Sequence, residues 1–118
     1  MANEISASIS CTISQSGQSV SGSKTFSATL SATNFIGEAV TVGSTTAAPL
    51  YIGGLSNPAV VCVINQDTTN FLTVAGDAAL ANFPQKILPG QGILLNPETG
   101  TIYAKADTAP VQAWVVAG

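Results

Sequence analysis

The chain has 118 residues and a net charge of −3, and only 8% of its residues are charged. Its cations are three scattered lysines, which cannot neutralise phosphates as nucleic-acid-binding proteins do, so nucleic acid is excluded as a partner, and an anionic membrane surface is disfavoured for the same reason. The apolar content of 46% argues against disorder, and the length predicts one β domain spanning residues 1–118.

The first half of the chain alternates between apolar and hydroxyl residues. Residues 5–14 alternate at every position, which predicts a half-buried strand, and residues 1–14 could form an N-terminal strand arm. The Ser- and Gly-rich stretch 15–23 is typical of a loop. Alternation resumes over residues 25–32, and a further strand is predicted at 39–42.

The second half is more apolar and has more frequent turn residues. Its predicted strands are 50–52, 59–64, 71–75, 86–88, 93–95, 101–106 and 111–117. Every residue from Ala59 to Ile64 is apolar, which predicts a central strand covered on both faces. The only helix candidate is the short run from Ala78 to Phe83, which Pro84 would end.

These elements predict an all-β fold. Eight to ten short strands at this spacing favour a jelly-roll-like β-sandwich or barrel. An immunoglobulin-like sandwich is disfavoured because Trp114 follows both cysteines in the chain.

The sequence lacks most of the residue combinations that catalytic and metal sites require. The chain has no His, so Ser-His-Asp and Cys-His sites are impossible, and two cysteines without His make a poor zinc site. The six acidic residues lie near turn residues or at the chain start, where solvated carboxylates are common. We therefore expect no enzyme activity, no cofactor and no metal, and we interpret Asn65 and Asp67 as turn-capping residues rather than calcium ligands.

The cysteines and aromatic residues allow several readings. Cys11 and Cys62 occupy apolar strand positions, which favours small core residues, although a disulfide between them stays possible. Four aromatic residues are expected in the core: Phe26, Phe35, Phe71 and Phe83. Three others could anchor an interface or stack on sugars: Tyr51, Tyr103 and Trp114.

A surface this poor in charge costs little to desolvate, which favours an assembly subunit over a monomer. The alternating strand that contains Ile5, Ala7 and Ile9 is the candidate for pairing across subunits, and the alternative is an ordinary strand of its own sheet. The first residues have neither a basic segment nor an apolar segment, and no apolar run is long enough to span a membrane. We therefore expect a protein that is made in a cytoplasm, is not secreted and does not bind a membrane.

Three stretches carry a resemblance to a known class of proteins. They are Ile64 to Phe71, Ile87 to Gly92 and Thr101 to Ala106, which place an Asn/Asp turn, a Pro-Gly turn and a Tyr-Ala-Lys-Ala strand in order. From Leu50 to its end, the chain resembles small β-rich structural proteins of tailed bacteriophages, of the capsid cement or decoration type. The first half of the chain carries no such resemblance.

The resemblance implies a virion component that binds the major capsid protein and itself, as a dimer or trimer. Three classes therefore compete. A capsid cement protein comes first, a tail or head-fibre module that binds host surface carbohydrate comes second, and a small hydrolase with paired carboxylates comes last.

Overall fold

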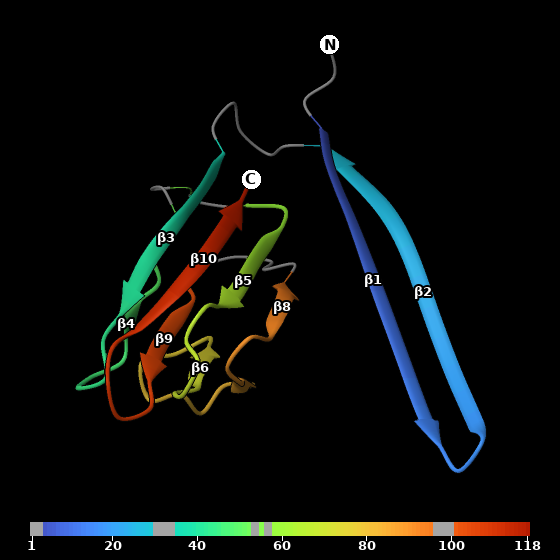
Figure 1. The fold of residues 1–118 in the computed structure, drawn as a ribbon. Helices are drawn as coiled ribbons and strands as arrows, with labels where there is room; N and C mark the ends of the chain where they lie inside the picture. The colour runs from blue at the N-terminus through green and yellow to red at the C-terminus, as the bar shows by residue number, and fades with distance from the viewer. Residues whose placement is uncertain (1–3, 30–34, 53–54, 56–57, 96–100) are drawn as a thin grey trace.

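A computed structural model of the chain describes residues 4–29, 35–52, 55, 58–95 and 101–118 (Figure 1). These residues form ten strands and no helix, which confirms the predicted all-β class. The strands are β1 (Glu4–Gln15), β2 (Gln18–Thr29), β3 (Ile36–Val42), β4 (Ala48–Pro49), β5 (Val61–Asn65), β6 (Leu72–Ala75), β7 (Gln85–Ile87), β8 (Gly92–Leu95), β9 (Tyr103–Ala106) and β10 (Val111–Ala117). No helix in these ranges has the length and apolar character to cross a bilayer.

The last eight strands build a jelly roll. The first sheet has the order β3-β10-β5-β8 and the second sheet has the order β4-β9-β6-β7, with every neighbouring pair antiparallel. The chain crosses repeatedly between the two sheets and returns through β10 to the centre of the first sheet. This strand order confirms the jelly-roll prediction.

Alternating side chains of both sheets fill the core. In β10, Val111, Ala113 and Val115 are fully buried, whereas the residues between them point outward. The largest buried side chains come from the central strands and include Val61, Val63, Leu72 and Val74. The buried cluster starts at Val42 and ends at Ala117, so none of its members belongs to β1 or β2.

Asn65 joins three segments at one end of the sandwich. Its side chain is fully buried, and its Nδ2 donates to the carbonyl oxygens of Asn70 (2.9 Å) and Ile87 (3.0 Å). Its Oδ1 accepts the backbone N–H of Asp67 at 2.8 Å. Its own backbone exchanges hydrogen bonds with Gln91 and Gly90. One residue therefore holds the turn after β5 against the end of β7 and the turn before β8.

Three local predictions are wrong. The strand predicted at 50–52 is displaced, because the strand of this region is β4 (Ala48–Pro49) and residues 50–52 have no strand assignment. The predicted helix at 78–83 is an irregular turn, in which the Oδ1 of Asp77 accepts the N–H groups of Ala81 and Asn82 at 2.9 and 2.8 Å. Leu80 and Phe83 have positive φ angles of 55° and 53°, which no right-handed helix allows.

The predicted loop at 15–23 is also wrong. Only Ser16 and Gly17 form the turn, and β2 starts at Gln18. The small polar residues resemble a loop in composition, but here they continue the alternation of a strand. Residues 30–32, where a strand was predicted, and Glu98 lie outside the described residues.

Candidate assembly interface

The first two strands form a long hairpin that stands apart from the jelly roll (Figure 1). All twelve residues of β1 pair with the twelve residues of β2, from Glu4 opposite Thr29 to Gln15 opposite Gln18. Ser16 and Gly17 connect the strands with φ angles of 51° and 81°. Two positive φ angles in a two-residue loop characterise the type I′ turn, whose twist matches that of the flanking strands.

The hairpin has one apolar face and one hydroxyl face. The apolar face, as described, consists of Ala7, Ile9, Cys11, Ile13, Val20, Gly22 and Lys24, with the Gln15–Gln18 pair at its tip. On the other face, five cross-strand pairs consist only of Ser and Thr: Ser6–Ser27, Ser8–Thr25, Ser10–Ser23, Thr12–Ser21 and Ser14–Ser19. Ile9, Ile13 and Val20 are all exposed, so nothing in the described chain covers the apolar face.

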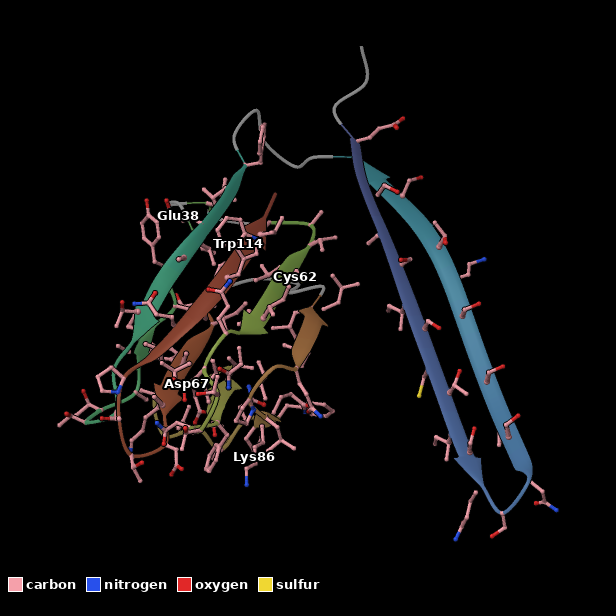
Figure 2. The ribbon with its side chains drawn as sticks, viewed as in Figure 1. Glu38, Cys62, Asp67, Lys86 and Trp114 are labelled. Atoms are coloured by element: carbon pink, nitrogen blue, oxygen red, sulfur yellow. The ribbon has the colours of Figure 1, made fainter. Side chains whose placement is uncertain are left out.

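The outer face of the first sheet, which points away from the core, is a second uncovered apolar surface. Its described residues are Gly37, Ala39, Thr41, Cys62, Ile64, Gly92, Leu94, Gln112, Trp114 and Val116. Trp114 lies between Ala39 and Ile64, and Val116 lies beside Cys62 (Figure 2). At the polar end of this face, two side chains hydrogen-bond to each other: Gln112 donates from Nε2 to the Thr41 hydroxyl oxygen at 2.6 Å.

An open groove separates the hairpin from this sheet. Its volume is about 860 Å³, and β1 lines one side with Ala7 and Ile9 of the apolar face and with Glu4, Ser6, Ser8 and Ser10 of the hydroxyl face. The first sheet lines the other side with residues that include Cys62, Leu94 and Val116. The two apolar surfaces therefore belong to one chain but do not close on each other.

Charge is almost absent from both surfaces. Lys24 is the only charged residue on the apolar face of the hairpin, and the outer face of the first sheet has none among its described residues. The thiol of Cys62 is half-buried on that face, and this desolvation raises its pKa. A neutral thiol adds to the apolar character of the surface.

The structure separates the residues that the sequence singled out for an interface. Ala7 and Ile9 lie on the apolar face of the hairpin, whereas Ile5 belongs to β1 with a side chain outside the description. Trp114 lies on the outer face of the first sheet. Tyr103 alternates with the buried Ala104 in β9, so it lies on the outer face of the second sheet. Tyr51 is exposed after β4.

The expected core positions of several residues are wrong. Phe35 and Phe83 are 71% and 83% exposed. Phe71 is half-buried, with the Lys86 Nζ 4.0 Å from its ring centroid (Figure 2). Cys11 is exposed and Cys62 half-buried, and both are free thiols, so neither is a core residue and no disulfide joins them. The side chain of Phe26 lies outside the description.

Asp67 caps the turn after β5. Its Oδ2 accepts the N–H of Thr69 at 3.0 Å and that of Asn70 at 2.6 Å. These backbone hydrogen bonds lower the pKa of the Asp67 carboxyl. Within the described residues, no three His, Cys, Asp or Glu side chains gather closely enough to hold a metal ion. The geometry of this turn is that of side-chain capping.

No protein family, curated protein or solved structure matches the chain. The fold and the two apolar surfaces must therefore carry any functional conclusion.

Sequence reasoning missed most of the apolar surface. Val20, Ile64, Leu94 and Val116 were not singled out for an interface, although all are accessible apolar positions on the two faces. A signal for part of this surface existed, because the run from Ala59 to Ile64 predicts a strand covered on both faces. In the described chain, the sandwich covers only the inner face of that strand.

Proposed function

We propose that the chain is a virion structural protein of the capsid cement or decoration type, which binds the major capsid protein and stabilises the shell through contacts made by several copies. The observation that carries this proposal is the pair of uncovered apolar surfaces on one small jelly roll, the apolar face of the hairpin and the outer face of the first sheet. Apolar surfaces of this kind, almost free of charge, are typical of protein interfaces.

The proposed location in a virion is based on the resemblance of three stretches to phage structural proteins. Two of the three stretches that carry it meet at Asn65, which bonds to Ile87, Gly90 and Gln91. The third stretch forms β9, which pairs with β6 directly after the Asn65 turn. The resemblance therefore concerns one contiguous corner of the jelly roll. Jelly rolls occur in viral capsid proteins and in lectins, so the architecture suits a virion subunit without identifying one.

A tail or head-fibre module that binds carbohydrate is the competing function. Such a module needs aromatic side chains gathered along one groove. Tyr103 and Trp114 lie on the outer faces of opposite sheets, so they cannot line a common groove. No observation on the described residues favours this function over the first.

The test is the copy number of the chain in purified virus particles, measured by quantitative mass spectrometry against the major capsid protein. An abundant host protein from the same lysate serves as the contamination control. A ratio near one, or a simple fraction such as one third, supports a symmetric shell component. A handful of copies per particle would assign the chain to the tail or a fibre, and absence from particles would overturn the virion assignment.

A further inference from the structure

The hairpin carries more apolar surface than an isolated hairpin can leave in water. Ile13 is 65% exposed and Val20 is 74% exposed, and the two face each other across the strands near the tip. A two-stranded hairpin without a packing partner is only marginally stable. Since β1 and β2 pair only with each other among the described strands, their apolar face needs a surface outside the hairpin.

The accessible area of the chain is larger than that of a compact monomer of the same mass. The chain exposes 7347 Å², whereas a compact monomer of 11.8 kDa is expected to expose about 5,900 Å². The excess of about 1,400 Å² per chain is larger than the area of about 800 Å² that each partner buries in an interface of standard size. Two copies that each covered this excess would bury about 2,800 Å², which falls in the range of obligate dimers.

The outer face of the first sheet fits the apolar face of the hairpin. Trp114 and Val116 are 37% and 44% exposed at the centre of this sheet, and Ile64 lies beside Trp114 on β5. Neither surface carries an acidic residue, and Lys24 is the only cation on either. Packing one on the other therefore removes apolar area from water with almost no cost of burying charge.

The hairpin is too long for the sheet of its own chain. Twelve residues of β1 span about 40 Å, whereas the seven residues of β10 span about 24 Å. Even if the base of the hairpin closed across the groove, Ile13 and Val20 would extend past the sheet. The sheet of a second copy has the same length, but its position along the hairpin is free, so it can lie opposite Ile13 and Val20.

We propose that the β1–β2 hairpin packs its apolar face on the outer face of the first sheet of a second copy of this chain. Reciprocal exchange of two hairpins closes a dimer, and the same contact passed around a ring closes a trimer. The proposal rests on the self-association that the proposed function includes. Its test uses the purified chain alone, so its failure and the absence of the chain from virus particles are separate results.

The first measurement is the mass of the full chain in solution by light scattering after size-exclusion chromatography. We expect a dimer or trimer of the 11.8 kDa chain. Ile13→Asp introduces a charge into the apolar face and should weaken association about 100-fold or more, which leaves a monomer. The matched control is Thr12→Asp, which puts the same charge on the hydroxyl face at the neighbouring position and should leave the mass unchanged. A monomeric wild type, or an Ile13→Asp variant that still associates, would overturn the proposal.

A second pair of variants identifies the partner surface. Val116→Asp blocks the sheet but leaves the hairpin intact, so it should also be monomeric, with a cooperative unfolding transition showing that it is folded. A mixture of Ile13→Asp and Val116→Asp chains keeps one good hairpin and one good sheet, and it should form heterodimers. If Val116→Asp still associates like the wild type, the hairpins pack on each other and the proposed contact is wrong.

The two native cysteines report directly on which chains touch, because Cys11 lies on the hairpin face and Cys62 on the sheet face. Equal amounts of ¹⁴N- and ¹⁵N-labelled chains are mixed, allowed to exchange and treated with a short bismaleimide. Exchange between copies predicts Cys11–Cys62 peptides that carry both labels. Peptides with a single label only would show that each hairpin closes on its own sheet, and Cys11–Cys11 products alone would show hairpin-on-hairpin packing; either result overturns the proposal.

Discussion

Asn65 is the one fully buried polar side chain in the described chain, and replacing it with Ala should destabilise the jelly roll more than any surface change. The substitution removes two hydrogen bonds that Nδ2 donates to Asn70 and Ile87 and one that Oδ1 accepts from Asp67. It also leaves a space where the amide was. The side-chain hydrogen bonds that hold the turn after β5 against the end of β7 are lost.

The expected cost follows from how buried each partner is. The bond to the Ile87 carbonyl is buried, so its loss costs about 2 kcal/mol in lost bonding and desolvation. The bonds to Asn70 and Asp67 are partly buried, and water can replace them at about 0.5 kcal/mol each. The total of about 3 kcal/mol corresponds to a fall in Tm of about 12 °C for a chain of this length.

Urea unfolding followed by circular dichroism, at fixed protein concentration, measures this loss as a lower midpoint with an unchanged slope. The matched control is Asn70→Ala, which removes an exposed side-chain bond to the Thr108 hydroxyl and should cost about 1 kcal/mol or less. Asn65→Asp should be at least as damaging as Asn65→Ala at neutral pH, because a carboxylate cannot donate to the two carbonyl oxygens. An Asn65→Ala variant as stable as the Asn70→Ala control would refute the role given to this residue.

Three further predictions concern stability and the limits of the folded unit. The pKa of Asp67 is lowered, so its stabilising effect is fully present above the ordinary value of 3.8 and is lost as the pH falls through the lowered pKa. The urea midpoint should therefore drop over that pH range. Asp67→Asn should make this drop shallower. Val74→Ala should cost about 2 kcal/mol because Val74 is buried in the core, whereas Thr73→Ala on the outer side of β6 should cost less than about 1 kcal/mol; equal losses would contradict the register of that sheet. Deleting residues 1–34 should leave a monomer that unfolds cooperatively by calorimetry, since the core cluster runs from Val42 to Ala117; loss of the transition would show that the hairpin is needed for folding.

The jelly roll could be predicted because its strands are short, apolar and bounded by turn residues. Alternation in Val111–Ala117 reports directly which side chains are buried, and the structure has the same pattern. The strand order could not be derived, because alternation gives the faces of a strand and not its neighbours. The jelly roll was favoured over an immunoglobulin-like sandwich because Trp114 follows both cysteines, and that comparison contains no information on strand order.

The local errors arose where composition and geometry disagree. Residues 78–83 contain Ala and Leu, which favour a helix, but the Asp77 carboxylate binds the N–H groups that a helix would use and stabilises a turn. Residues 18–23 contain Ser and Gly, which are typical of loops, but they pair with residues 10–15 of β1 across a complete ladder. In both cases the deciding partners are near in the sequence, but residue composition alone does not show which hydrogen bonds they make.

For two segments of the proposed interface, the burial predicted from the sequence differs from the burial in the structure. Ala59–Ile64 predicts a strand covered on both faces, and the jelly roll covers one. Residues 5–14 predict a strand with one buried face, and the hairpin leaves that face exposed. Periodicity records that a side chain is to be covered, but it does not record which chain covers it.

These two unmet expectations have one common solution. A hairpin whose Ile13 and Val20 stayed in water would gain nothing from them and would offer a long apolar ribbon for aggregation. A sheet whose Trp114 and Val116 stayed in water would carry the same hazard. Both surfaces are apolar and uncovered, so each can cover the other. The hairpin is longer than the sheet of its own chain, so its tip would extend past that sheet. In the proposed contact between copies, both surfaces would be covered at once, and the Ser- and Thr-rich face of the hairpin would remain outward, where hydroxyl groups cost little to desolvate.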